Sequence, residues 1–210
     1  MILPALAVFV LGYVIGSIQP GLIVGRLVRG VDIREYGSGK TGFTNTLRTL
    51  GLVPALVVVF GDIAKGVVPV LVGDLVIGSA LASALGGVGA VVGHTWPVFA
   101  GFRGGRGVAT SFGAFFAMAP LPATAAILAG LAILAVTRYV SLMSMLGVAL
   151  GLGVMAWLVT AGRMPAEYLI FGVAVTLSVE LNHLGNLRRL LQGTEPKLGQ
   201  GGVPRAPGAA

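Results

Sequence analysis

The sequence predicts an all-α integral membrane protein with seven transmembrane helices, and three observations support this prediction. Of the 210 residues, 56% are hydrophobic and only 10% are charged, whereas a soluble domain carries about 25% charged residues. The apolar residues come in long blocks rather than along one face of a helix or strand, which is typical of helices surrounded by lipid. The chain also has 34 glycines, and small residues let transmembrane helices approach one another closely.

The first predicted span covers residues 3–25, close to the roughly 20 residues that a bilayer core needs. Gly12 and Gly16 are four residues apart, so they share a helix face that is suited to close packing against a neighbouring helix. A basic pair, Arg26 and Arg29, ends this span on its polar side.

The second predicted span covers residues 52–73 and contains two charged side chains. Asp62 and Lys65 are three residues apart, so they lie on one helix face. A charge within a span costs roughly 2.5–3.5 kcal/mol on insertion scales, so we expect both to face the protein interior. They form either a structural ion pair or a support for a functional site.

The remaining predicted spans follow at 77–98, 108–118, 121–137, 142–161 and 166–182. The run at 108–118 reaches only about 17 Å at 1.5 Å per residue, short of a bilayer core of roughly 30 Å, so it is either a thin span or a half-span. Residues 193–210 are rich in Gly, Pro and Ala, which predicts a disordered tail. Residues 1–192 are therefore expected to form one membrane-embedded domain.

The basic residues fix the expected orientation. An outside N-terminus and a cytoplasmic C-terminus place 12 of the 14 Lys and Arg residues on the cytoplasmic side, as the positive-inside rule requires. We therefore expect a multi-pass protein of the inner (plasma) membrane. The same topology brings four polar segments to the cytoplasmic face, where they can form one site: 32–51, 101–107, 138–144 and 183–189.

The segment 32–51 is polar, Gly-rich and basic, and such a loop can surround a small anion with backbone N–H groups and cations. It contains GxGxxG at 37–42, but the dinucleotide fingerprint needs a preceding β-strand, which a membrane helix does not provide. It also resembles the end of a P-loop, yet Arg34 stands where the first glycine is required. Thr44 or Asn45 could cap a short helix that carries Arg48.

The other polar segments add cations and hydrogen-bonding side chains. Arg103 and Arg106 flank two glycines, which favours a phosphate clamp at the bilayer surface over lipid contacts or an RGG arm for nucleic acid. His94, at the end of a span, is either a hydrogen-bonded interfacial residue or part of the site. His183 and Asn186 share a helix face if the helix continues. Three further side chains share a face at 138–144: Arg138, Ser141 and Ser144.

Several classes of chemistry are excluded. With no cysteine in the chain, thiolate catalysis and Cys-ligated zinc are ruled out. No Ser–His–Asp order and no cluster of metal ligands is apparent, so we expect neither a metal nor a cofactor. A site rich in cations and N–H donors instead suits phosphorylated small molecules.

Six motifs in this order resemble the bacterial membrane acyl-phosphate:glycerol-3-phosphate acyltransferases, over residues 10–196. They are GSI at 16–18, VDIREYGSGKTGFTNTLRTLG at 31–51, DIAKG at 62–66, GHTWPVFAGFRGGRGVAT at 93–110, RYVSLMS at 138–144 and NHLGNLRRLLQGTEP at 182–196. The resemblance implies a seven-helix fold with a cytoplasmic active site.

The resemblance also implies a reaction. An acyl phosphate transfers its acyl group to the sn-1 hydroxyl of glycerol 3-phosphate, which gives lysophosphatidic acid and phosphate and opens phospholipid synthesis. His183, Arg48 and Arg106 would be catalytic. The acyl phosphate would be held by Ser38, Gly39, Thr44 and Asn45, and glycerol 3-phosphate by Arg48, Arg106, Arg138, Ser141 and Asn186. The protein is expected to act as a monomer among membrane lipids, without nucleic acid.

The chain departs from the family where Lys40 replaces Asn, Phe43 replaces Ala, Arg106 replaces Lys and Leu184-Gly185 replaces a more polar pair. These departures leave open a diverged paralogue that uses another donor. A small lipid or phosphate transporter is the other alternative. A soluble-type acyl-CoA acyltransferase would have HxxxxD, but Phe99 stands at the Asp position after His94.

Overall fold

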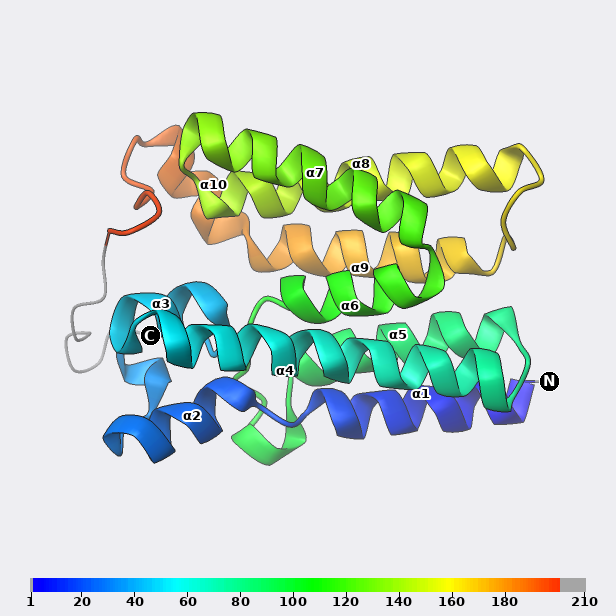
Figure 1. Ribbon diagram of the computed structural model, residues 1–210, viewed down its shortest axis with the longest axis horizontal. Coiled ribbons are helices and arrows are strands. Elements are labelled where there is room, and N and C mark those ends of the chain that lie inside the picture. Colours follow the sequence, from blue (N-terminus) through cyan, green and yellow to red (C-terminus); the bar gives the residue numbers. More distant parts are fainter. Residues whose placement is uncertain (1, 201–210) are drawn as a thin grey trace.

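In the computed structural model, residues 2–200 are described, and within this range the protein is helical with no β-strand. The helices lie side by side along one long axis, and short helices and loops gather at one end (Figure 1). The elements, in order, are α1 (Ile2–Gly16), α2 (Pro20–Arg29), η1 (Ile33–Glu35), α3 (Phe43–Leu50), α4 (Leu52–Leu71), η2 (Val72–Val76), α5 (Ala80–Thr95), η3 (Val98–Ala100), α6 (Val108–Met118), α7 (Pro120–Thr137), α8 (Val140–Thr160), α9 (Tyr168–Asn182) and α10 (Leu184–Leu191).

Among residues 2–200, four helical segments are long and apolar enough to cross a membrane, and α9 with α10 makes a fifth if the bent pair counts as one span. The four are residues 2–29, 52–76, 120–137 and 140–160. Helix α5 has only 16 residues and α6 only 11, so the structure supports an integral membrane fold while seven full spans stay a prediction. The outside N-terminus likewise stays a prediction.

Glycines bring the first helices into close contact, as the sequence predicts. A side chain at Gly12 would collide with the carbonyl oxygen of Gly86, and one at Gly16 with that of Ala90. Helix α1 therefore packs along α5 with little more than backbone between them. Helices α4 and α6 meet in the same way, because a side chain at Gly66 would collide with the Thr110 carbonyl.

A second group of helices, α7, α8 and α9, packs beside the first. One hydrophobic core connects both groups, because Val91 of α5, Phe115 of α6 and Phe171 of α9 belong to the same buried cluster. Many large apolar side chains stay exposed on the outer faces, among them Phe60, which is 66% exposed, and Leu177, which is 57% exposed. In lipid, these faces need no further cover.

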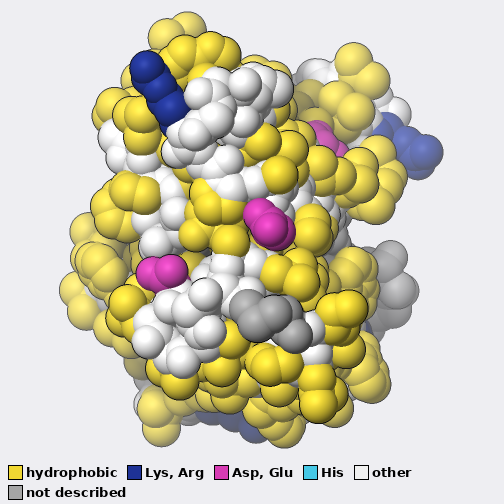
Figure 2. Space-filling view, turned by 90° about the vertical axis from the view of Figure 1, so that its right-hand side faces the viewer, with side chains coloured by type: hydrophobic (Ala, Val, Ile, Leu, Met, Phe, Trp, Pro, Cys, Tyr) yellow, Lys and Arg dark blue, Asp and Glu magenta, His cyan; other side chains and the backbone are white. Residues whose placement is uncertain are grey.

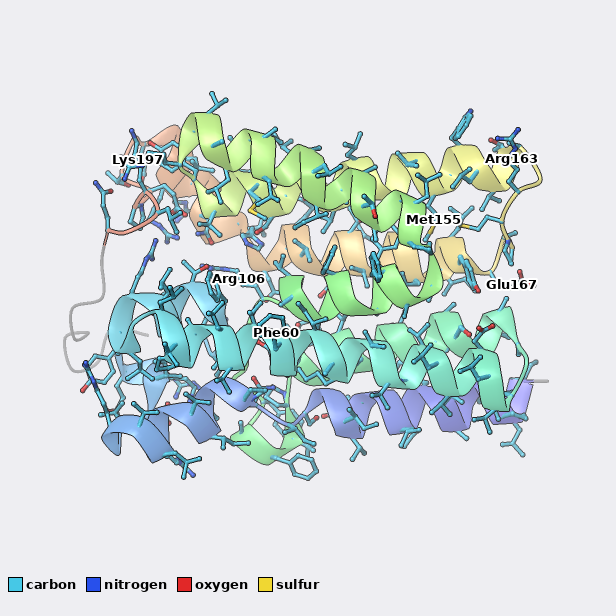
Figure 3. All side chains as sticks on the ribbon, viewed as in Figure 1. Phe60, Arg106, Met155, Arg163, Glu167 and Lys197 are labelled. Atoms are coloured by element: carbon cyan, nitrogen blue, oxygen red, sulfur yellow. The ribbon has the colours of Figure 1, made fainter. Side chains whose placement is uncertain are left out.

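Charged residues are unequally distributed between the two ends of the bundle. The end that carries the N-terminus presents mostly hydrophobic side chains with few charged ones (Figure 2). Arg163 and Glu167 lie at this end, whereas Arg106 and Lys197 lie toward the opposite end with α3 and α10 (Figure 3). The polar segments singled out in the sequence are therefore gathered at one end of the molecule.

Candidate active site

The Gly-rich segment forms a turn that leads into α3. Gly37 and Gly39 have φ angles of 50° and 67°, in the left-handed region that glycine adopts without strain. Asn45 is 2% exposed and organises the turn: its Oδ1 accepts from the Ser38 N–H at 2.9 Å, and its Nδ2 donates to the carbonyls of Ile33 and Lys40, both at 2.9 Å. The amide of Asn45 thus shapes the loop predicted to bind the acyl phosphate.

The predicted cap at this helix is wrong, although the helix carrying Arg48 is confirmed. Gly42, not Thr44 or Asn45, is the N-cap, and it provides no side-chain hydrogen bond. The extended conformation of Gly42 places Thr44 inside the first turn of α3, where it is partly exposed. The backbone N–H groups of this first turn point out of the helix, as an anion-binding helix start requires.

Arg48 and Arg106 approach the same region from separate elements, α3 and the loop before α6. The Nε atom of each is buried and has no hydrogen-bond partner among residues 2–200. Burial lowers the pKa of Arg48 from its ordinary value. Burial also lowers the pKa of Arg106, to about 10, against the opposing effect of Glu195 and assisted by Arg189 and Arg48. Both guanidinium groups stay positively charged at neutral pH and hold N–H donors ready for an anion.

His183 stands between α9 and α10, whose axes differ by 52°, so the straight continuation considered for His183 and Asn186 does not occur. His183 is 1% exposed, and its Nδ1 lies 2.8 Å from the Val179 carbonyl oxygen. Because a carbonyl oxygen only accepts, Nδ1 carries the proton and Nε2 is left as an acceptor. Asn186, one turn into α10, is also buried.

Glu195 connects the tail to α8 and α10, and the sequence interpretation missed it. Its Oε1 accepts from Asn186 Nδ2 at 2.6 Å and from Ser141 Oγ at 2.8 Å, and its Oε2 accepts from Arg189 Nε at 2.8 Å. Burial would raise the pKa of Glu195, but these three hydrogen bonds outweigh it and hold the pKa below its ordinary value. The composition of the tail concealed this contact.

The rest of the tail up to Gln200 also folds back over this end of the bundle. Arg138 Nη2 donates to the Leu198 carbonyl at 3.3 Å, and Arg48 Nη2 donates to the Pro196 carbonyl at 3.5 Å. The bond to Leu198 holds the exposed side chain of Arg138 against the tail. Ser141, in contrast, is buried beside Glu195. The predicted disorder of residues 201–210 lies outside the described residues.

Asp62 and Lys65 form the predicted ion pair, with 2.9 Å between Oδ1 and Nζ. His94 is 3% exposed, and its Nδ1 lies 3.3 Å from the same Asp62 oxygen. His94 is therefore a buried partner of this pair rather than an interfacial residue. Arg103 is exposed, and its carbonyl accepts from Arg34 Nη1 at 3.3 Å.

The site so described is a set of cations and N–H donors around the buried carboxylate of Glu195. Comparison with known proteins fits this chemistry. The sequence model of a family described as "Glycerol-3-phosphate acyltransferase" matches residues 6–193. The chain is 45% identical over 195 residues to "Glycerol-3-phosphate acyltransferase 2" of Moorella thermoacetica, with 93% of this chain and 98% of that protein covered. The chain belongs to the glycerol-3-phosphate acyltransferase family.

Other members of the glycerol-3-phosphate acyltransferase family give the same result. The protein of that name from Halalkalibacterium halodurans is 40% identical over 190 residues, with 90% of this chain and 92% of that protein covered. The fold matches the crystal structure of PlsY, an integral membrane glycerol 3-phosphate acyltransferase in its glycerol 3-phosphate form. That match has a TM-score of 0.85 and 36% identity and covers 93% of this chain and 96% of PlsY. The predictions of a membrane acyltransferase and of its family are confirmed.

Proposed function

We propose that this acyltransferase moves an acyl group from acyl phosphate to the sn-1 hydroxyl of glycerol 3-phosphate. The products are 1-acyl-sn-glycerol 3-phosphate, which is lysophosphatidic acid, and inorganic phosphate. This reaction opens phospholipid synthesis, and it takes place at the cytoplasmic face of the inner membrane. The fold's similarity to PlsY in a form named for lysophosphatidic acid, with a TM-score of 0.82, supports this product.

The pair formed by Arg48 and Arg106 is the observation on which the proposal rests. Two guanidinium groups, each with a buried Nε–H that has no partner among residues 2–200, suit a phosphate dianion, and such charge-assisted hydrogen bonds are stronger than neutral ones. Glu195 is already engaged by Asn186, Ser141 and Arg189. It therefore does not neutralise Arg48 and Arg106 completely, and they can bind glycerol 3-phosphate.

The turn around Ser38 and Gly39 supplies the second anion site, for the phosphate of the donor. Positive φ at Gly37 and Gly39 closes this turn, within which the Ser38 N–H donates to Asn45 Oδ1 and the Gly39 N–H to the Tyr36 carbonyl. The start of α3 at Phe43 adds the N–H groups and the positive end of the helix dipole. In this assignment Asn45 holds the loop in shape rather than contacting the donor.

The chemistry requires no enzyme nucleophile, because an acyl phosphate is already activated. The sn-1 oxygen attacks the acyl carbonyl carbon, the bond from that carbon to the phosphate oxygen breaks, and the electron pair leaves with the phosphate. The hydroxyl proton passes to the departing phosphate, which we favour, or to Nε2 of His183. Holding both substrates in place contributes roughly 7–11 kcal/mol, and the surrounding cations stabilise the developing negative charge.

An apolar cavity between α6, α7, α8 and α9 suits the acyl chain. It begins at Val108 and Ser111, within one turn of the loop that carries Arg106, and continues to Phe171 of α9. Glycines on three helices, Gly130, Gly147 and Gly172, line its walls. We assign this cavity to the hydrocarbon tail of the donor.

A direct assay tests the proposal. Purified protein in detergent or vesicles receives glycerol 3-phosphate with either palmitoyl phosphate or palmitoyl-CoA, and lysophosphatidic acid is measured by mass spectrometry. We expect product from the acyl phosphate. Product from the thioester alone would assign another donor, and phosphate flux across sealed vesicles without acyl transfer would favour a transporter.

A further inference from the structure

A buried glutamine stands at the break between α1 and α2, outside the groups assigned above to either substrate. Gln19 is 4% exposed, and every polar atom of its amide has a partner. Its Nε2 donates to the carbonyls of Gly16 and His94, both at 3.3 Å, and its Oε1 accepts from Thr41 Oγ1 at 2.6 Å. Because two carbonyls can only accept, the amide has one possible orientation.

The His94 carbonyl also receives a hydrogen bond from the second substrate loop. The Gly105 N–H donates to it at 3.2 Å, and the neighbouring Gly104 N–H donates to the Thr95 carbonyl at 3.2 Å. The approach is as close as backbone allows, since a side chain at Gly105 would collide with His94 Nε2. Gln19 therefore connects Thr41, in the donor loop, through one carbonyl to Gly105, next to Arg106.

This connection is anchored by the buried ion pair. Lys65 Nζ donates to the carbonyl of Ile18, the residue before Gln19, at 2.7 Å. Its partner Asp62 faces the His94 ring at 3.3 Å. The same ion pair thus holds the Ile18 backbone before Gln19 and the His94 imidazole. Gln19 therefore cannot move with one loop alone.

We propose that Gln19 and Thr41 are positioning residues that fix the distance between the donor loop and the Arg106 loop. This inference rests on the proposed function, in which the two loops hold the two reactants. A displacement of about 1 Å between reacting groups can cost on the order of 10²-fold in rate. Thr41, which is 1% exposed, contacts neither substrate in this arrangement, and neither does Gln19.

Two substitutions at Thr41 separate the hydroxyl from its packing. Thr41→Val keeps the shape and removes the donor to Gln19, so we expect kcat to fall at least about fivefold, the scale of one buried hydrogen bond. The KM of each substrate should change less than about twofold, because each loop keeps its own ligands. Thr41→Ser restores the hydroxyl and should restore kcat. Ser83→Ala, which removes another buried hydroxyl, one that donates to the Ser79 carbonyl just before α5, is the matched control and should leave kcat unchanged.

Hydrogen exchange measures the coupling without any activity. Thr41→Val and Gln19→Leu should speed amide exchange in residues 101–107, far along the chain from both substitutions, whereas Thr41→Ser and Ser83→Ala should not. An unchanged exchange rate in 101–107 would overturn the proposal, as would a raised KM for acyl phosphate at constant kcat, since Thr41 would then be a direct ligand. If the wild-type protein uses no acyl phosphate, the proposed function fails, and the exchange result still decides the coupling.

Discussion

Lys65 Nζ lies 2.9 Å from Asp62 Oδ1 on α4, and both residues are at most 5% exposed. Their charges are thus almost completely shielded from the surface of the protein. Removing one member of a buried pair leaves an unpaired charge, which costs about 3–5 kcal/mol, whereas replacing both members is often close to neutral. Single and double substitutions at Asp62 and Lys65 therefore measure how much this contact stabilises the bundle.

Lys65→Met should destabilise the protein by this amount because Asp62 loses its cation. The double variant Asp62→Asn with Lys65→Met should recover a large part of the loss, since no unpaired carboxylate remains. Unfolding of each variant in mixed micelles, followed by circular dichroism, measures the loss of stability in the single and in the double variant. Equal losses in the single and double variants would show that Lys65 matters through packing and its bond to the Ile18 carbonyl instead.

Arg48→Ala should reduce acyl transfer at least about tenfold. The reason is the loss of a charge-assisted contact to phosphate, of about 1.5 kcal/mol or more. We expect the KM for glycerol 3-phosphate to rise, which steady-state kinetics over that substrate will measure. Arg188→Ala, at an exposed arginine of α10, is the control. Wild-type kinetics in Arg48→Ala would remove this residue from the acceptor site.

Arg106→Lys should keep or improve turnover, because the ammonium retains the charge in a position where the family resemblance implies lysine. Arg106→Met removes the charge and should lower kcat/KM by on the order of 10²-fold. Both variants are compared with wild type at saturating and limiting glycerol 3-phosphate. Complete loss in Arg106→Lys would show that the loop depends on the planar fork of arginine.

Composition and helical spacing were enough to predict three features of the fold. These are the membrane class, the close packing at Gly12 and Gly16, and the Asp62–Lys65 pair. The bend at His183 could not be predicted, since an apolar run gives no sign of where a helix axis turns. The length of the apolar run also led to a predicted span, 77–98, that is longer than the observed helix, Ala80–Thr95. There the helix ends at Thr95, and a short turn, Val98–Ala100, follows.

Glu195 and Gln19 show what sequence patterns leave out of a site. Glu195 lies in a segment whose Gly and Pro content predicts disorder, yet its carboxylate receives three hydrogen bonds from residues 54, 9 and 6 positions away. The carbonyl that Gln19 meets is 75 residues away. Such contacts depend on tertiary arrangement, which neither periodicity nor local propensity encodes.

Glu195→Gln should lower stability at neutral pH and have less effect in acid. The folded-state pKa of Glu195 lies below its ordinary value of 4.5, so the ionised form stabilises the fold. This contribution is complete above pH 4.5 and is lost as pH falls through the lowered pKa. The difference in Tm between wild type and Glu195→Gln should thus shrink as the pH is lowered below 4.5. A constant difference across that range would exclude ionisation as its source.

The cavity between α6 and α9 predicts how chain length should affect activity. Thr176 lines it, while the next residue, Leu177, is 57% exposed on the outer face of the same helix. Thr176→Trp fills the cavity, so transfer from palmitoyl phosphate should fall at least about tenfold, the loss expected when burial of roughly two methylene groups is prevented. Transfer from butanoyl phosphate should fall much less, because Thr176 lies seven residues before His183, about 10 Å along the helix, and a four-carbon chain does not reach that far. Leu177→Trp adds the same bulk toward lipid and should change neither rate. A chain-length profile that is identical in Thr176→Trp and wild type would place the acyl chain elsewhere on the bundle.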